Sequence, residues 1–567
     1  LRSRGLGDVY KRQLLIVFLF VASCMAFAQQ PIRLHKFPNL SSDTWFYRDT
    51  CRNVAGRFPG FSPFFMIYPD KACDSLQAVS LIKELGLEKY VRTYSGSVCV
   101  MNPMGAAYDN KADLDAFKEC LERMRIATNL KVIGIGKGAT FVNKAIATHA
   151  GMIAGIVSID GDKGKFDASY SPVPVYVTGK GASQTASIYI KQNKAMLSKK
   201  DKACVVYKNE NEPLLQVVVN NKKHTSLAET IDDAWDKLLC KNYRFNNFKH
   251  TWYTGGSVEK YGDFELEPYI MPEEWGITRK VIEKDLLGTG TFLWYEFHPE
   301  ATLKAPKGSV PLLLLLHGNN NDPRTQAETS GFIELCAEEN FVVAELEWQG
   351  NGYAPMGFDG IEQVVYHMLK TYPQLDPSRV YAEGLSAGAA TVTGLGIRKS
   401  YLFAAVGAQS AGLTPNRYMF GYNGEAMMNE VIQKRGFVEM PYFSVTGKDD
   451  KVVPFVTMDN WETNAFFCAW NAYQIMNGME ISTKPDFSLD PVFGIKLENR
   501  ETVPTNKGIT MEMGVQYKGE KPLIKVVVVN DYGHWNFKPD AKVMWDFFKQ
   551  YARDPITKKL FFKSVGK

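Results

Sequence analysis

The chain has 567 residues, of which 45% are hydrophobic and 22% charged, with a formal net charge of +5 at pH 7. A domain usually takes ~100–200 residues, and an α/β domain up to ~250 or more, so this length suggests two domains, and the composition is typical of globular proteins that bury a core. Four basic residues and one acidic residue within the first twelve positions supply +3 of the charge, which leaves +2. No basic stripe is present, and we therefore expect no nucleic-acid partner.

The N-terminal 28 residues have the pattern of an export signal. The opening LRSRGLGDVYKRQ resembles translated sequencing-adapter sequence and is treated as a spurious start. The apolar run that follows is too short to span a bilayer and ends in a small-x-small cleavage motif, AFA, at 26–28. We expect cleavage after Ala28 and a secreted or periplasmic protein, whereas the lipobox VASC at 21–24 indicates the alternative of a lipoprotein anchored through Cys24. No later segment is apolar enough to cross a membrane.

The cysteine pattern does not favour a zinc site. Eight of the nine cysteines follow Ala28, and none of them has CxxC spacing. An oxidising compartment permits disulfides among the six that precede residue 245, and buried free thiols are the alternative. These six are Cys51, Cys73, Cys99, Cys120, Cys204 and Cys240.

The chain contains an internal repeat. Four blocks of the N-terminal half recur in the same order in the C-terminal half: 131–147 matches 379–396, 151–161 matches 401–412, 174–182 matches 441–450, and 213–224 matches 522–534. Each copy alternates apolar β-rich runs with helical patterns, which predicts a mostly parallel α/β sheet flanked by helices. The fold class is therefore α/β, with tandem domains.

The first copy lacks the residues of a hydrolytic site. Its stretch VIGIGKGAT (132–140) lacks the GK[ST] ending of a phosphate-binding loop. Gly136 instead occupies the place that Ser386 takes in the second copy, and Gly181 and Ala182 replace two aspartates. His224 remains without a nucleophile or an acid. We predict a degenerate, non-catalytic domain over 29–250, with a scaffold or a glycan- or substrate-binding role.

Residues 276–300 are predicted to form antiparallel strands that lead into the second copy. The domain boundary is expected between 245 and 270, where the sequence is polar and contains glycine. The catalytic domain is accordingly predicted to span 251–567.

The second copy carries a serine, an aspartate and a histidine in the order of an α/β-hydrolase triad. Ser386 lies in GLSAG between a predicted strand and a predicted helix, which is the G-x-S-x-G nucleophile elbow. Asp450 follows the strand PYFSVTG, with Asp449 as a rival, and His534 follows the strand IKVVVVN. Acyl transfer needs a nucleophile, a base and an acid that orients the base, so we predict these three as the catalytic residues.

Oxyanion donors are expected at two backbone positions. The strand LLLLL ends in His-Gly before a polar turn, and such a turn places one donor in these enzymes. We assign the donors to the N–H groups of Asn319 and Ala387, with His317 as a structural residue that positions the loop.

A segment around 456–515 is longer in the second copy than its counterpart in the first. It carries an aromatic stripe at helical spacing, which predicts a helical subdomain. Since ligands bind at the carboxyl ends of parallel strands, we expect a helical cap over the active-site edge. Trp348 and Trp535 are candidates to line the substrate cleft, with the core as their alternative location.

At these motifs the sequence resembles the polyhydroxybutyrate-depolymerase and feruloyl/acetylxylan-esterase group of secreted α/β-hydrolases. The resemblance covers about 270–555 and is carried by PLLLLLHGNNND, LDPSRVYAEGLSAGAA, YLFAAVGAQSAG, VTGKDDKVVP and DYGHWNF. It implies a serine esterase that needs no metal or organic cofactor. Many members have a cysteine directly after His-Gly, where this chain has Asn319.

Three functions follow from the sequence. The first is an exported carboxylic-ester hydrolase acting on carbohydrate-linked acetyl or feruloyl esters or on small polyesters. A prolyl-oligopeptidase-like peptidase with the same triad is the second, and a non-catalytic binding protein is the third. The sequence does not specify the oligomeric state.

Overall fold

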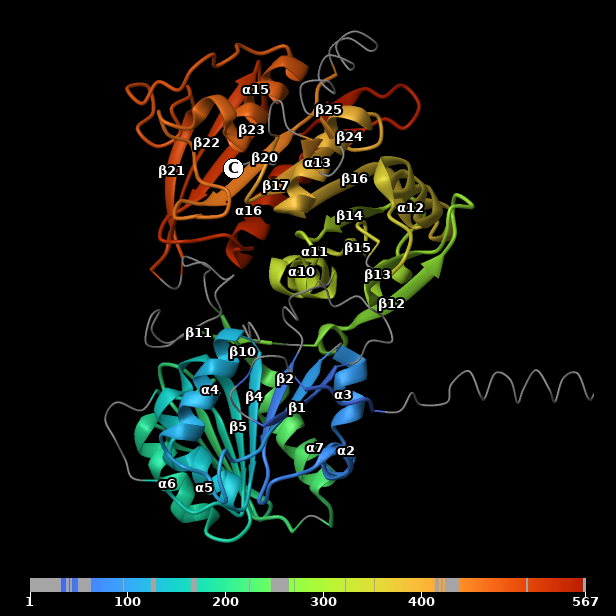
Figure 1. Ribbon diagram of the computed structural model, residues 1–567. Helices are drawn as coiled ribbons and strands as arrows, with labels where there is room; N and C mark the ends of the chain where they lie inside the picture. Colours follow the sequence, from blue (N-terminus) through green and yellow to red (C-terminus); the bar gives the residue numbers. More distant parts are fainter. Residues whose placement is uncertain are drawn as a thin grey trace, which may run out of the picture.

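The structure is a computed structural model. It describes residues 32–36, 40, 43–48, 63–94, 96–123, 129–164, 171–223, 225–245, 265–269, 271–321, 323–350, 352–413, 418–419, 422–423, 438–505 and 508–563. Figure 1 shows two bodies, one below the other, each built on a sheet with helices on its faces. The predicted α/β class is confirmed.

The first sheet is mostly parallel and lies in the N-terminal half. Over the described residues it has nine strands, in the order β1-β3-β2-β4-β5-β6-β9-β8-β7. The strands are β1 (Thr44–Arg48), β2 (Phe64–Tyr68), β3 (Ser97–Met101), β4 (Leu130–Ile135), β5 (Ile153–Ile159), β6 (Val175–Thr178), β7 (Met196–Lys200), β8 (Cys204–Lys208) and β9 (Gln216–Asn220). The helices are α2 (Ser75–Glu84), α3 (Leu87–Tyr94), α4 (Ala112–Arg123), α5 (Lys137–Lys144), η1 (Ile146–Met152), α6 (Ala182–Gln192), α7 (Leu227–Lys237) and η2 (Leu239–Lys241). Central strands such as FFMIY of β2 are buried along their whole length, because helices cover both faces of a parallel sheet.

A two-stranded ribbon connects the halves. Strands β10 (Asn242–Phe245) and β11 (Glu265–Pro268) pair antiparallel, and η4 (Pro272–Trp275) follows them. The antiparallel pair β12 (Ile277–Lys284) and β13 (Phe292–Pro299) then opens the second sheet, as predicted. Most of the expected boundary, residues 246–264, lies outside the described residues.

The second sheet has ten strands within the described ranges, in the order β12-β13-β15-β14-β16-β17-β20-β23-β22-β21. Its further strands are β14 (Val310–Leu316), β15 (Val342–Leu346), β16 (Leu375–Leu385), β17 (Ala405–Gln409), β20 (Tyr442–Gly447), β21 (Glu498–Pro504), β22 (Thr510–Lys518) and β23 (Lys521–Val529). The helices are α9 (Glu300–Leu303), α10 (Pro323–Ser330), α11 (Phe332–Glu339), α12 (Gly357–Thr371), α13 (Ala387–Arg398), η5 (Trp461–Thr463), α15 (Ala465–Asn477) and α16 (Lys538–Phe548). Two small pairs stand apart, β18 (Tyr418–Met419) with β19 (Tyr422–Asn423) and β24 (Tyr551–Arg553) with β25 (Leu560–Phe562).

The two sheets share one strand order. When β12 is set aside, each strand of the first sheet has a counterpart at the same place in the second, including the antiparallel edge strands β8–β7 and β22–β21. The four repeated sequence blocks fall on β4 and β16, β5 and β17, β6 and β20, and β9 and β23. The sequence repeat therefore corresponds to a repeat of the fold.

The expected helical cap at 456–515 is wrong. Helix α15 covers the sheet, where its aromatic residues pack in the core with Tyr442 of β20. After an irregular stretch over 478–497, the segment continues into the edge strands β21 and β22. Asn464 caps the start of α15 by accepting from the N–H groups of Phe466 and Phe467, and Gly478 ends the helix in a left-handed conformation. The first half has the same elements in α6, β7 and β8, so the segment is a longer version of a shared unit.

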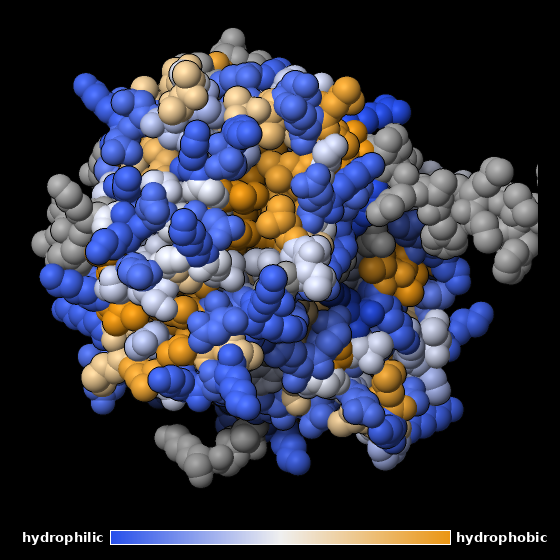
Figure 2. Space-filling view, turned by 90° about the horizontal axis from the view of Figure 1, so that it is seen from below, coloured by the Kyte–Doolittle hydropathy of each residue, from blue (hydrophilic) through white to orange (hydrophobic). Residues whose placement is uncertain are grey.

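Figure 2 shows the end formed by the first half, where hydrophobic residues gather among hydrophilic ones. Single exposed apolar side chains such as Leu76 and Met104 are usual on protein surfaces. None of the helices that the structure describes is long and apolar enough to pass through a bilayer.

The cysteines of the described part are free thiols: Cys73, Cys99, Cys120, Cys204, Cys240, Cys336 and Cys468. Cys24, Cys51 and the predicted signal lie outside the described residues.

We expect Trp470→Ala on α15 to lower the free energy of unfolding by about 3–5 kcal/mol, because it empties a core site. The indole is 1% exposed and packs against the rings of Phe455, Phe467 and Phe493. Urea titration followed by far-ultraviolet circular dichroism measures the change. The control Leu489→Ala, at a residue 64% exposed in the same segment, is expected to stay within about 0.5 kcal/mol. An equal effect of both variants would contradict the packing of α15 on the sheet.

Candidate active site

Ser386 lies at a sharp turn between β16 and α13. Its backbone has φ 53° and ψ −112°, a conformation that residues other than glycine rarely adopt. Gly388 permits the turn, because a Cβ there would lie 1.9 Å from the carbonyl oxygen of Leu316 at the end of β14. The turn exposes the serine side chain at the carboxyl edge of the sheet, as expected of a nucleophile elbow.

His534 and Asp450 complete a hydrogen-bonded chain with Ser386. Nε2 of His534 lies 2.9 Å from Oγ of Ser386, and Nδ1 lies 2.7 Å from Oδ2 of Asp450. With the proton on Nδ1, the ring donates to the carboxylate and Nε2 accepts from the serine hydroxyl. The histidine and the aspartate are only 3% and 2% exposed. The structure thus brings the three predicted residues into contact.

Asp450 is held as an acceptor by its own loop. Its Oδ1 accepts from the N–H groups of Val452 and Val453 at 2.8 and 2.9 Å, which leaves Oδ2 for the histidine. Asp449, the rival in the sequence, donates its backbone N–H to the carbonyl of Tyr532. The backbone of the neighbouring aspartate thereby ties this loop to the segment that carries His534.

The two predicted oxyanion donors lie on the segments expected of them. Ala387 is the first residue of α13, and Asn319 is in the turn after β14. Within that turn, the N–H of Asn320 donates to Gln349 Oε1 at 2.6 Å and that of Asn321 to Gly318 O at 3.0 Å. Neither of these two amides is available to a substrate, which favours Asn319 as the donor of this loop.

Residues after β15 fasten the same turn. Gln349 also donates from Nε2 to Oδ1 of Asn319 at 3.0 Å, so one side chain holds two successive residues. Nε2 of His317 lies 3.2 Å from Oε1 of Glu347, and its Nδ1 lies 2.7 Å from Gly318 O. Both His317 and Glu347 are fully buried. These contacts give His317 the structural place in the loop that the sequence predicts. Gln349 also holds the turn, and no pattern in the sequence indicated this role.

The two tryptophans proposed for the substrate cleft are largely buried. Trp348 is 6% exposed, and its indole N–H donates to the carbonyl of His317 at 2.9 Å. Trp535 is 7% exposed and belongs to the core under α16. Trp348 supports the oxyanion turn from behind, and the lining of the cleft by either residue stays a prediction.

Two buried carboxyl groups lie behind the triad. Burial, with a smaller contribution from the nearby Asp540, raises the pKa of Glu383 on β16 well above its usual range. Burial likewise raises the pKa of Asp540, whose Oδ2 accepts from Nε2 of Gln409 at 2.9 Å. Burial thus favours the protonated form of both acids. In the sequence, a buried acid at this place is indicated by a glutamate in the otherwise apolar strand VYAEGL.

The first half keeps the turn but not the chemistry. Gly136 has φ 54° and ψ −114°, nearly the values of Ser386. Oδ1 of Asp70 accepts from the N–H of Lys137 at 2.9 Å, which is the amide equivalent to that of Ala387. A carboxylate of the chain itself thus occupies the vestigial oxyanion position. His224 lies outside the described residues.

Comparisons with known proteins gave structural likenesses only. No protein-family model and no curated protein matches the chain. Acetyl xylan esterase from Aspergillus awamori is 14% identical with a TM-score of 0.34, over 48% of this chain and 99% of the other. The feruloyl esterase module from Clostridium thermocellum is 12% identical with a TM-score of 0.29, over 46% and 83%. S-formylglutathione hydrolase (FrmB) from Staphylococcus aureus is 15% identical with a TM-score of 0.26, over 31% and 80%.

Within the described ranges, no group of three His, Cys, Asp or Glu side chains is arranged to hold a metal ion.

We expect Asp70→Ala to lower the free energy of unfolding by about 1 kcal/mol, because it removes the acceptor at the start of α5. Ester turnover is expected to stay unchanged, since the vestigial turn lacks a nucleophile. Differential scanning calorimetry and an esterase assay check the two expectations, with the exposed neighbour Lys71→Ala as control. A loss of turnover in Asp70→Ala at unchanged stability would contradict the vestigial assignment.

We expect Glu383→Gln to stabilise the protein increasingly as the pH rises from 4 to 8. The folded state keeps Glu383 protonated while the unfolded chain ionises it, so folded wild-type protein binds more protons and loses stability with rising pH. Gln imitates the neutral form and escapes this loss, which amounts to about 1.4 kcal/mol for each pH unit between the two pKa values. Urea titrations across this range measure the difference, with exposed Glu520→Gln as control. A difference independent of pH would show that Glu383 is ionised in the folded protein.

Proposed function

We propose that the protein is a serine hydrolase of carboxylic esters, with its site in the C-terminal half. The observation that carries the proposal is the hydrogen-bonded chain from Ser386 through His534 to Asp450. The positive φ of Ser386 also supports the proposal, because such a strained backbone is maintained only where the surrounding structure enforces it.

In the proposed reaction, Oγ of Ser386 attacks the ester carbonyl while Nε2 of His534 takes its proton. Asp450 keeps the ring oriented and stabilises the imidazolium that forms. The N–H groups of Asn319 and Ala387 stabilise the oxyanion, and the imidazolium protonates the departing alcohol. Water, deprotonated by the same nitrogen, then releases the acid and restores the serine.

For the substrate we propose carbohydrate-linked acetyl or feruloyl esters, or small polyesters. This finer proposal rests on the sequence resemblance over 270–555 rather than on the geometry of the triad, because one hydrolase fold hosts many substrates. We likewise propose export, on the pattern of residues 14–28, and a division into a vestigial domain at 29–250 and a catalytic domain at 251–567.

We expect Ser386→Ala to abolish ester hydrolysis and labelling by a fluorophosphonate probe. Asp450→Asn is expected to lower kcat by about 10⁴-fold, because the ring loses its orienting acceptor. The matched control Asp449→Asn should change kcat by less than about threefold, since its carboxylate is not the partner of His534. Assays on p-nitrophenyl acetate and on acetylated, feruloylated and polyester substrates measure these effects.

Two results would contradict the proposal. Absence of probe labelling in the folded wild-type protein would favour a binding protein over an enzyme. Faster turnover of aminoacyl-proline anilides than of all the esters would favour a peptidase.

A further inference from the structure

Helix α10 connects the oxyanion turn to the histidine loop. It begins at Pro323, directly after that turn, and its buried face contacts Asn536, two residues beyond His534. Nε2 of Gln326 donates to Oδ1 of Asn536 at 2.8 Å, and Nδ2 of Asn536 donates to Oγ1 of Thr329 at 3.1 Å. The helix therefore holds the segment that carries the base.

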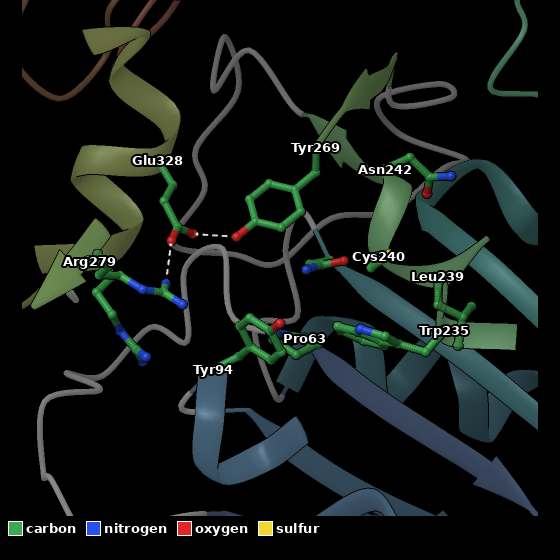
Figure 3. A pocket seen from close by; sticks show the side chains of 11 residues that line it. Pro63, Tyr94, Trp235, Leu239, Cys240, Asn242, Tyr269, Arg279 and Glu328 are labelled. Carbon is green, nitrogen blue, oxygen red and sulfur yellow. Dashed lines mark hydrogen bonds and ion pairs between the residues drawn. The ribbon is translucent and has the colours of Figure 1, made fainter. Parts of the chain in front are cut away.

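Another face of α10 is held by the connection between the halves. Glu328 is 8% exposed and accepts from two donors, the hydroxyl of Tyr269 at 3.1 Å and Nη1 of Arg279 at 3.1 Å. Figure 3 shows the carboxylate of Glu328 facing Tyr269 of the connection and Arg279 of β12. Removing the tyrosine hydroxyl takes one hydrogen bond from a largely buried carboxylate and so weakens its link to the connection.

The ribbon that carries Tyr269 is anchored in the first half. Nζ of Lys131, fully buried on β4, donates to the carbonyl of Asn242 at 2.6 Å, and Nε of Arg244 donates to that of Ile153 at 3.1 Å. The backbone N–H of Tyr269 in turn donates to the carbonyl of Lys241 at 2.8 Å.

The boundary beside these residues is closely packed. The cavity drawn in Figure 3, lined by Tyr94 and Trp235 from the first half, has a volume of about 20 Å³. Such a space holds about one water molecule and no substrate. The boundary at this place is therefore a packing contact between the halves and has no room for a substrate.

A second contact reaches the same loop two residues beyond Asn536. Nζ of Lys538, the first residue of α16, lies 5.9 Å from the ring centre of Tyr243 on β10 and also pairs with Glu334 of α11. Lys538 is four residues after His534. The ribbon thus contacts both α10 and the start of α16, the two helices joined to the segment after His534.

We propose that the catalytically vestigial half positions the base of the active site. Tyr269 and Glu328, acting through α10, and Tyr243, acting through Lys538, are positioning residues for His534. This inference rests on the proposed function, and it assigns to the first half a role that its own lost nucleophile does not suggest.

The test uses the full chain with Tyr269→Phe, which removes one hydroxyl, and with Lys538→Met. The matched control is Glu274→Gln, which alters an exposed ion pair with Lys241 at the same boundary. Kinetics on p-nitrophenyl acetate are normalised to active sites titrated with a fluorophosphonate, so that unfolded protein is not counted. Hydrogen exchange of residues 530–540 is followed by mass spectrometry as a readout that does not depend on turnover.

We expect Tyr269→Phe and Lys538→Met each to lower kcat by about three- to thirtyfold, with KM within about twofold of the wild type. Exchange across 530–540 should be faster in both variants and unchanged in Glu274→Gln. Unchanged kcat and unchanged exchange in Tyr269→Phe and Lys538→Met would overturn the inference. If the wild-type protein hydrolyses no ester, the proposed function fails, and the exchange measurement still decides whether the ribbon holds the loop.

Discussion

The close approach of α13 to the end of β14 is the contact on which the site depends. Because Gly388 has no side chain, the helix begins directly against the carbonyl of Leu316. This proximity places the first amide of α13 beside the turn after β14 and turns Ser386 into its left-handed conformation. The first half shows the same approach, since a Cβ on Gly138 would lie 2.0 Å from the carbonyl of Tyr68. The repeat has therefore kept its backbone geometry where it has lost its nucleophile.

Much of the fold was accessible from the sequence because its signals are local. Buried parallel strands appear as apolar runs, and the glycines of the elbow mark where a strand and a helix meet closely. The order of serine, aspartate and histidine, each after a strand, was enough to select residues that meet in space. The choice of Asp450 over Asp449 depends on how one loop turns, and only the structure shows which carboxylate approaches the ring.

Other features escaped because they depend on contacts distant in sequence. The aromatic stripe in 456–515 predicts a helix but not the face against which it packs, and strand β21, ENRETVP, is exposed along nearly its whole length and has no apolar alternation that would indicate a strand. Gln349 lies about thirty residues beyond the turn that it holds. Asp70 belongs to no motif in the sequence, and its contact with Lys137 is apparent only once β2 and β4 are known to be neighbours.

The contact of Asp70 also limits how the first half can evolve. A Cβ at Gly136 would meet the Asp70 carboxylate at 2.2 Å, so a serine there would require this side chain to move away from the Lys137 amide. An acid would also have to stand in the place of Ala182, the first residue of α6. Building a triad at this turn would thus take coordinated changes at several positions of the first half.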